Sequence, residues 1–531
     1  MPANLAGMRA VRAFLVVATA IAVCLPALAA EARPKRSRAV LCQARISSDG
    51  SAQDTACTDG RQVKTPRAMT VVAHIDTGVN PYSKNFRDRS PLAYKHPSTY
   101  IPGFPTGAEA LRLHLDMPYE KAFKADEDVW KLVRRNQLYW IPGTKIIGAI
   151  SFGAGTTSCP QTVKLPVVSV LDQGDCTEHV VLDDAGHGSM TASRSTGILT
   201  SLAPDARLVT IEGLGAPSVE WAADQGWIDV QTNSWLSLVP PPIPSNVTEA
   251  FADAAARMPT LAASGNGSAY LAGVAPTPTY LLSTAPPGVI LVGGHDNGKT
   301  TLWAGAPPHV VADAYAGPTA IFNSSTEVRP DPISCCTSAA SPYAAGGAAA
   351  LIEEARRILG DRTTGVHDGI LAQGRCGAVK KGPLADGDFT LEEFNDLFFH
   401  TAQSHPAEGE HDGLVHWAGD PRPPDYTEYG PGGNPFCIGC TTTPVPWSQI
   451  PEEVDAYQFI GYGGINEFSV QLGQKVLQGK TDPPLRETAD IQYEVDQSIR
   501  ELMFDGATSG EISNEIEMSV CVVAAREIEP N

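Results

Sequence analysis

The sequence predicts an α/β domain with a mostly parallel central sheet and helices on both faces. Short apolar runs rich in β-branched residues alternate with stretches of helical spacing along the chain, which is the pattern of a sheet covered by helices. The run 69–75 is largely apolar and does not alternate with polar residues, as expected of a strand buried on both faces. An Ala- and Gly-rich stretch, 338–350, predicts a helix buried on most sides.

The other predicted elements follow the same two patterns. Thr390 and Glu393 have the spacing of a capping box, which predicts a helix over 391–402. Apolar strand-like runs occur at 144–152, 168–171, 207–213, 230–234, 260–263 and 289–293, and helical spacing occurs at 119–138, from 190 onward, at 250–258 and at 491–504.

Composition and charge narrow the class of protein. The chain has 531 residues, of which 43% are hydrophobic and 18% charged, and this is globular composition. Its formal net charge of −20 argues against nucleic acid or an anionic membrane as a partner, because both attract basic surfaces.

The N-terminus has the features of an export signal. Arg9 and Arg12 precede an apolar run, 13–25, and the small-residue pattern Ala27-Leu28-Ala29 follows it. This arrangement predicts a signal peptide at 1–29 and a secreted or periplasmic protein. A membrane anchor is the alternative, but the run is shorter than the ~20 residues that span a bilayer, so we expect no membrane insertion of the mature chain.

Cysteine usage fits export. Of 11 cysteines, Cys24 lies in the predicted signal peptide, which leaves ten (11 − 1). An even number in an exported chain favours disulfides, although the sequence leaves the connectivity open. Cys42 with Cys57 and Cys159 with Cys176 would close short loops. Cys437 and Cys440 have the spacing of a redox motif or half a zinc site, but a structural disulfide is the simpler interpretation.

Three segments place chemically active side chains at the ends of predicted elements. Asp76 directly follows the strand 69–75, His187 lies between two glycines at a helix start, and Ser338 opens the Ala- and Gly-rich helix. A serine hydroxyl is a weak nucleophile unless a neighbouring base takes its proton, and histidine is the usual base. A carboxylate beside the histidine fixes its tautomer and stabilises its protonated form.

These segments, 75–79, 184–189 and 336–342, resemble the three catalytic motifs of the subtilisin-like serine proteases (peptidase S8 family), in that family's chain order of acid, base and nucleophile. The resemblance spans about 69–479 and implies a three-layer subtilisin-like fold. It also implies an endopeptidase with Asp76, His187 and Ser338 as its catalytic triad. An α/β-hydrolase is disfavoured, because that fold has another chain order and the sequence contains no G-x-S-x-G segment.

The resemblance extends to other parts of the site. Asn266, in the segment 261–267, corresponds to the family's oxyanion-hole asparagine, and this role explains it better than a glycosylation sequon does. Substrate contacts are expected around two short segments: Ser234, Trp235 and Leu236, and Ala263, Ser264 and Gly265. The implied substrates are proteins or peptides. No cofactor is required for the chemistry, structural calcium is expected from the resemblance without assigned ligands, and the oligomeric state stays open.

The domain organisation follows from these motifs. We predict a polar N-terminal segment at 30–68, a peptidase domain at 69–480 and a C-terminal tail at 481–531. Asp76 and His187 lie 111 residues apart (187 − 76), which implies a large insertion, at about 95–165.

The sequence also departs from the family pattern. Ser189 stands where the family usually has threonine, and Cys336, preceded by Cys335, stands where it has glycine. The two cysteines could bond to each other, pair with others or stay free. Cys336 and the large insertion motivate an alternative function, a catalytically weak or inactive pseudoprotease that acts as a protein-binding module.

Overall fold

The computed structural model describes residues 45–46, 52–53, 69–152, 181–183, 186–235, 246–265, 286–296, 299–303, 308–314, 319–320, 328–329, 336–361, 365, 369–403, 445–446 and 461–505. The predicted signal peptide, the predicted strand 168–171 and every cysteine except Cys336 and Cys376 lie outside these residues.

A large, mostly parallel sheet forms the centre of the fold. Its middle strand β3 (Val71–Asp76) pairs in parallel with β7 (Arg207–Glu212) on one side and β8 (Val230–Asn233) on the other. All six residues of β3 are buried, which explains why its sequence is apolar rather than alternating. The α/β fold with a mostly parallel sheet is therefore confirmed.

The sheet continues outward from β3 in both directions, in the order β17-β11-β10-β9-β8-β3-β7-β6-β5-β4, and β12 joins β10 to β18. The pairs β5–β6, β10–β11 and β11–β17 are antiparallel. The outer strands are β4 (Glu109–Ala110), β5 (Tyr139–Trp140), β6 (Ile146–Ser151), β9 (Thr260–Ala263), β10 (Ile290–Asp296), β11 (Lys299–Trp303), β12 (Val310–Asp313), β17 (Val445–Pro446) and β18 (Gly464–Ile465).

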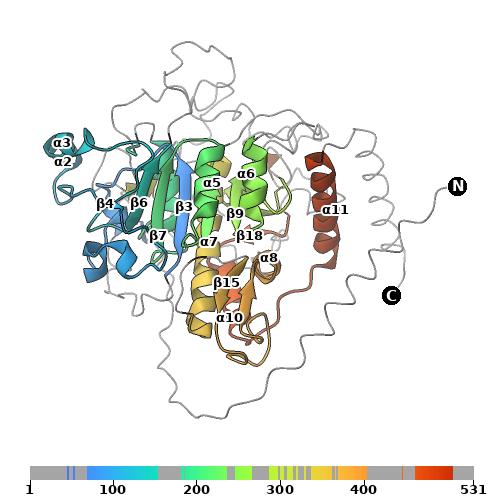
Figure 1. Ribbon diagram of the computed structural model, residues 1–531. Helices are drawn as coiled ribbons and strands as arrows, with labels where there is room; N and C mark the ends of the chain where they lie inside the picture. The colour runs from blue at the N-terminus through green and yellow to red at the C-terminus, as the bar shows by residue number, and fades with distance from the viewer. Residues whose placement is uncertain are drawn as a thin grey trace, which may run out of the picture. The chain divides into compact units, whose positions relative to one another are not determined.

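Helices cover both faces of this sheet, as the sequence predicts. In Figure 1, α5 (Ala216–Asp224) and α6 (Asn246–Ala255) lie in front of the strands, and α7 (Cys336–Leu359) lies behind them. The helix α4 (His187–Thr196) packs against α7 and against β3. This packing brings the start of α4 to the carboxyl end of β3.

Smaller elements complete the described chain. Antiparallel pairs join β1 (Arg45–Ile46) to β2 (Ala52–Gln53), β13 (Thr319–Ala320) to β14 (Val328–Arg329), and β15 (Ile370–Gln373) to β16 (Asp388–Thr390). The helix α8 (Leu391–His400) begins with the predicted capping box at Thr390, and α10 (Glu467–Leu477) packs against α7 and α8. Three short 3₁₀ helices are η1 (Lys84–Phe86), η2 (Pro91–Tyr94) and η3 (Pro97–Thr99).

The helical spacing at 119–138 corresponds to two short helices rather than one. The helices α2 (Tyr119–Ala125) and α3 (Glu127–Trp130) are separated by Asp126, and the chain then leads into β5. The buried Asp126 carboxylate accepts hydrogen bonds from the Tyr82 hydroxyl at 2.9 Å and from the His114 backbone N–H at 2.8 Å. The backbone of Asp126 departs from helical geometry, with φ of −99° and ψ of 7°, and its carboxylate is bound by groups outside the two helices.

The predicted C-terminal tail contains a helix that packs on the domain. This helix, α11 (Glu487–Phe504), extends the predicted amphipathic stretch toward the N-terminus. Asp496 of α11 lies 2.9 Å from the ring of the buried His309, and Gln497 accepts a hydrogen bond from the Gly288 N–H at 2.9 Å.

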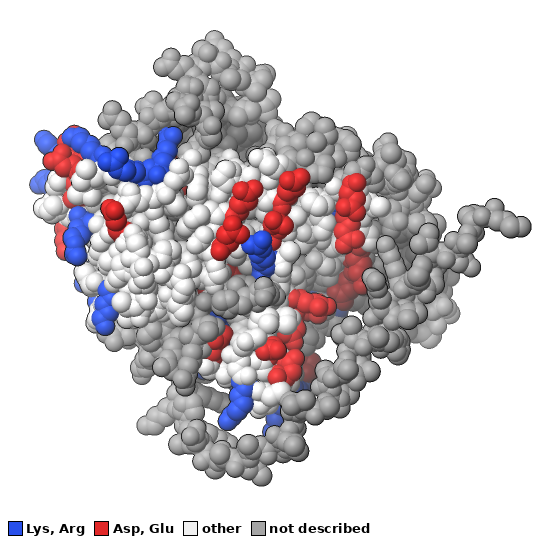
Figure 2. All heavy atoms as spheres, in the orientation of Figure 1, with Lys and Arg blue, Asp and Glu red and all other residues white. Residues whose placement is uncertain are grey.

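The surface in front of the sheet is acidic. Figure 2 shows carboxylate side chains over α5, α6 and α11 on this face, in keeping with the net charge of −20. The exposed carboxylates of these helices include Glu220, Asp224, Glu249, Asp253, Glu494 and Glu501. None of the described helices is long and apolar enough to cross a membrane.

Candidate active site

The site begins at the carboxyl end of β3, where Asp76 is the last residue of the strand. Its carboxylate is 1% exposed, and Oδ1 accepts a hydrogen bond from the Thr77 N–H at 2.8 Å. Gly78 follows with φ of +111°, a backbone conformation that suits glycine. The chain therefore turns sharply away from the sheet and leaves the aspartate facing α4.

His187 is the first residue of α4 and lies next to Asp76. Its Nδ1 is 2.7 Å from Asp76 Oδ1, and its side chain keeps 29% of its surface exposed. Gly188 lets α4 approach this closely, because a Cβ at that position would lie 2.1 Å from the Gly78 carbonyl oxygen. The structure thus brings together two of the three predicted triad residues in a direct contact.

The start of α4 is held by Asp183, a residue to which the sequence analysis assigned no role. Its carboxylate accepts hydrogen bonds from the N–H groups of Gly186 at 2.8 Å and Ser189 at 2.5 Å, which are unpaired donors of the first helical turn. Asp183 Oδ1 also accepts from the Thr77 hydroxyl at 2.9 Å, and the Thr77 Oγ1 accepts from the Gly188 N–H at 2.9 Å. These bonds connect the turn after β3 to the helix that carries His187.

Asp76 and His187 shift each other's pKa in opposite directions. Burial raises the pKa of Asp76, but the charge of His187 and its hydrogen bond outweigh burial, so the net pKa lies below the usual range. Burial lowers the pKa of His187, but the charge and hydrogen bond of Asp76, with a contribution from Asp183, raise it above its ordinary value of 6.5. The pair therefore favours a carboxylate that stabilises a protonated imidazole.

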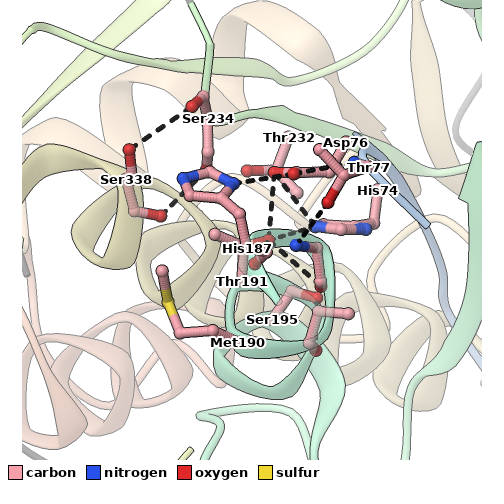
Figure 3. Close-up of polar contacts among 12 residues, drawn as sticks. His74, Asp76, Thr77, His187, Met190, Thr191, Ser195, Thr232, Ser234 and Ser338 are labelled. Atoms are coloured by element: carbon pink, nitrogen blue, oxygen red, sulfur yellow. Dashed lines mark hydrogen bonds and ion pairs between the residues drawn. The ribbon is translucent and has the colours of Figure 1, made fainter. Parts of the chain in front are cut away.

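Ser338 lies in the first turn of α7 and is half-buried. Figure 3 shows the His187 ring between the Asp76 carboxylate and Ser338. The Ser338 hydroxyl donates to the Ser234 carbonyl oxygen at 3.3 Å, and the Ser234 hydroxyl donates to the Ser338 carbonyl oxygen at 2.9 Å.

The bond from Ser234 has a local cause. In an α-helix the Ser338 carbonyl would accept from the N–H four residues later, but that residue is Pro342, which has no N–H. The Ser234 hydroxyl supplies the missing donor. It also ties the end of β8 to the start of α7.

The structure describes most of the predicted substrate-contact residues. Trp235 is 6% exposed and its ring packs 5.5 Å from that of Phe251, so most of it belongs to the core. Ala263 and Ser264 are also buried, and Gly265 has φ of +93°. Leu236 and the predicted oxyanion donor Asn266 lie outside the described residues.

Two further polar residues lie next to Asp76, and little in the sequence pointed to either of them. His74, two residues before Asp76 on β3, is 1% exposed, and Thr191 is fully buried in α4. Thr191 donates a hydrogen bond to Asp76 Oδ2 at 3.0 Å. A histidine within a buried, β-branched run is the only sequence signal that could have pointed to them.

Among the described residues, no three His, Cys, Asp or Glu side chains are grouped as a metal site would require. Structural calcium stays an expectation from the resemblance. Cys376 is exposed, and its Sγ donates to the Asp386 carbonyl oxygen at 2.6 Å.

Comparison with solved structures finds serine proteases. The chain is similar to an epidermin leader peptide processing serine protease from Staphylococcus aureus, determined as a mutant, with 12% identity and a TM-score of 0.36 over 77% of this chain and 76% of that chain. A second structure of that protease gives 15% identity and a TM-score of 0.30 over 54% and 66%. A cold adapted subtilisin-like serine proteinase gives 13% identity and a TM-score of 0.28 over 59% and 83%.

No family model matches the chain, and no curated protein matches it either. At these identities and TM-scores the likeness to the solved structures says nothing of activity. The function is therefore inferred from the chain's own residues.

Proposed function

We propose that the protein is a secreted serine endopeptidase that hydrolyses peptide bonds of proteins or peptides through an acyl-enzyme on Ser338. The observation that carries the proposal is the 2.7 Å contact between His187 Nδ1 and the buried Asp76 carboxylate, at the place where α7 presents Ser338. Because Nδ1 is engaged by Asp76, the other ring nitrogen, Nε2, is left to act on the serine.

The proposed reaction follows from this arrangement. His187 Nε2 takes the proton of the Ser338 hydroxyl as Oγ attacks the scissile carbonyl carbon, and Asp76 stabilises the imidazolium. The N–H groups at the start of α7 favour the negative charge on the tetrahedral intermediate, and Asn266 would add a side-chain donor. His187 then gives the proton to the leaving amine. Water, activated by the same base, releases the acyl group and restores Ser338.

The test is labelling of the purified mature protein with a fluorophosphonate probe, followed by peptide mapping. The probe requires an activated serine but no particular peptide sequence, so it is independent of specificity. We expect labelling at Ser338, and we expect it to be lost in His187→Ala. His114→Ala is the matched control, because the His114 Nδ1 also lies 2.6 Å from a buried carboxylate, that of Asp126, and its loss should leave the labelling intact.

Hydrolysis of a casein substrate should likewise vanish in Ser338→Ala while the circular dichroism spectrum is retained. Activity that survives in this variant would exclude the proposal. A folded wild-type protein that takes no label under either reducing or oxidising conditions would favour the protein-binding pseudoprotease, which the Cys336 at a glycine position motivates. Labelling under one condition only would point to Cys335 and Cys336 as a redox control.

A further inference from the structure

A chain of hydrogen bonds extends the proposed triad into the core. His74 and Asp76 are two residues apart on β3 and so lie on the same face of the strand. Thr191 is four residues after His187 on α4, on the same side of that helix. The His74 Nε2 lies 2.6 Å from Thr191 Oγ1, which in turn lies 3.0 Å from Asp76 Oδ2 (Figure 3).

The single hydroxyl proton of Thr191 has three oxygen acceptors within reach. These are Asp76 Oδ2 at 3.0 Å, the His187 carbonyl at 2.9 Å and the Gly188 carbonyl at 3.2 Å. Threonine in a helix commonly bonds back to the carbonyls of the preceding turn. An additional influence is therefore needed to direct the Thr191 hydroxyl proton toward Asp76 Oδ2.

His74 supplies that influence when its proton is on Nε2. Nε2 then donates to Thr191 Oγ1, so the hydroxyl proton points away from His74, and the two bonds polarise one another along the chain. The Asp76 carboxylate favours this tautomer, because its Oδ2 lies 3.7 Å from Nε2. Nδ1 of His74 is buried and has no hydrogen-bond partner among the residues that the structure describes. A structural role alone would be served better by an apolar side chain at this position.

The surroundings keep His74 neutral. The strands on either side of it, β7 and β8, place Thr210 and Thr232 next to it in register, and neither residue is charged. In the described part of the chain, Asp76 and His187 are the charged groups that act on His74. Burial lowers the pKa of His74 to about 4, although Asp76 opposes this effect, and His187 lowers the pKa further.

We propose that His74 and Thr191 form a positioning pair that holds Asp76 Oδ2, so that Oδ1 faces His187, and that this pair moderates the basicity of His187. The inference rests on the proposed peptidase function for its catalytic meaning, but the hydrogen-bond chain can be tested without turnover. A donor on Oδ2 disperses the carboxylate charge. Its removal should make Asp76 a stronger partner for the imidazolium and raise the pKa of His187.

The experiment is a double-mutant cycle with His74→Val, Thr191→Val and the combined variant. The acid limb of the kcat/KM profile should move to higher pH by about half a unit in each single variant, the size expected for loss of one hydrogen bond. The double variant should show the same shift rather than the sum, because the two residues act in one chain. Thr191→Ser keeps the hydroxyl and should retain the wild-type acid limb.

Thr210→Val is the matched control. It is the same substitution on the strand beside His74, at a buried hydroxyl with no hydrogen-bond partner among the described residues. It should leave the acid limb in place. If a single valine variant does not fold, the acid limbs of two other variants can still be compared with that of the wild-type protein. These are the combined variant, which leaves an apolar pair, and Thr191→Ser. Reduced kcat with an unmoved acid limb in the valine variants would overturn the inference.

The titration of His187 should also be followed by the ¹H NMR signal of its Nδ1 proton, in a Ser338→Ala background. An unchanged His187 pKa in the combined variant overturns the positioning pair even if the enzyme is active. If the His187 pKa is raised in the combined variant and the wild-type protein is inactive, the positioning pair is supported and only the proposed function is overturned.

Discussion

A buried ion pair lies at the end of the fold remote from the proposed active site, and loss of one of its partners is expected to reduce stability strongly. Arg356 Nη2 lies 2.6 Å from Asp229 Oδ1, and both side chains are 0% exposed. Asp229 directly precedes β8, and its Oδ2 accepts from the Val71 N–H at the start of β3 at 2.7 Å. Arg356 belongs to the last turns of α7. The pair thus joins the ends of β3 and α7 that are remote from Asp76 and Ser338.

We expect Asp229→Ala to destabilise the protein by about 3–5 kcal/mol, the cost of leaving one partner of a buried pair uncompensated. The Arg356 guanidinium would keep its bonds to the carbonyl oxygens of Leu371 and Gly365, both at 2.9 Å, but these carry no full charge. The Val71 N–H would also lose its acceptor, and a buried unpaired donor costs about 1–3 kcal/mol. Both effects lower the stability of the variant.

The measurement is equilibrium unfolding in urea, followed by tryptophan fluorescence, in a Ser338→Ala background so that self-digestion does not interfere. Asp224→Ala is the matched control, because Asp224 pairs with Arg257 at 2.8 Å while the two side chains are 67% and 47% exposed. An exposed pair contributes at most about 1 kcal/mol.

Equal losses in Asp229→Ala and Asp224→Ala would refute the reasoning. The combined variant Asp229→Leu with Arg356→Met should be more stable than Asp229→Ala, because it leaves no buried charge. If it is not, the cost comes from the lost bonds to the backbone, and the charge is not the cause.

Two further predictions concern His187 and the glycine beside it. The pKa of His187 is raised above 6.5, and the base must be neutral to accept a proton. We therefore expect kcat/KM to increase as the pH rises through a value above 6.5. A wild-type acid limb below pH 6.5 would contradict the assignment of His187 as the base. Gly188→Ala should lower kcat/KM by roughly 10²-fold, since its Cβ would force α4 away from β3. Gly107→Ala, where a Cβ meets nothing within 4 Å, should have no such effect, and equal losses would exclude close packing as the reason.

Much of the sheet could be predicted from the sequence because its strands are buried on both faces. The predicted runs at 207–213 and 260–263 coincide with β7 and β9 to within a residue. The contact of Asp76 with His187 was expected as well, but only because their two segments resemble the catalytic motifs of a known family. Local patterns alone place each residue at the end of an element and do not say that the two meet.

The hydrogen-bond chain beneath the site could not be predicted in the same way. His74 and Thr191 are 117 residues apart, and their contact exists only because α4 packs across β3. Periodicity places both residues on buried faces but does not say which buried groups meet. The contacts of the buried Asp126 carboxylate have the same origin, because its partners include Tyr82, which lies 44 residues earlier.

The two ends of the sheet differ in what their polar groups do. At one end, the Asp229 carboxylate is satisfied by Arg356 and by the backbone N–H groups of Val71 and Gly365, and both charged side chains are fully buried. At the other end, His187 is partly exposed, and the Ser338 carbonyl depends on a side chain because Pro342 removes its helical donor. A partly exposed group, or one that depends on a side chain from another element, adds little to stability, so it can persist only where other contacts fix the same elements. The buried pair fixes β3 and α7 at their remote ends, and we expect it to hold in place the ends that carry Asp76 and Ser338.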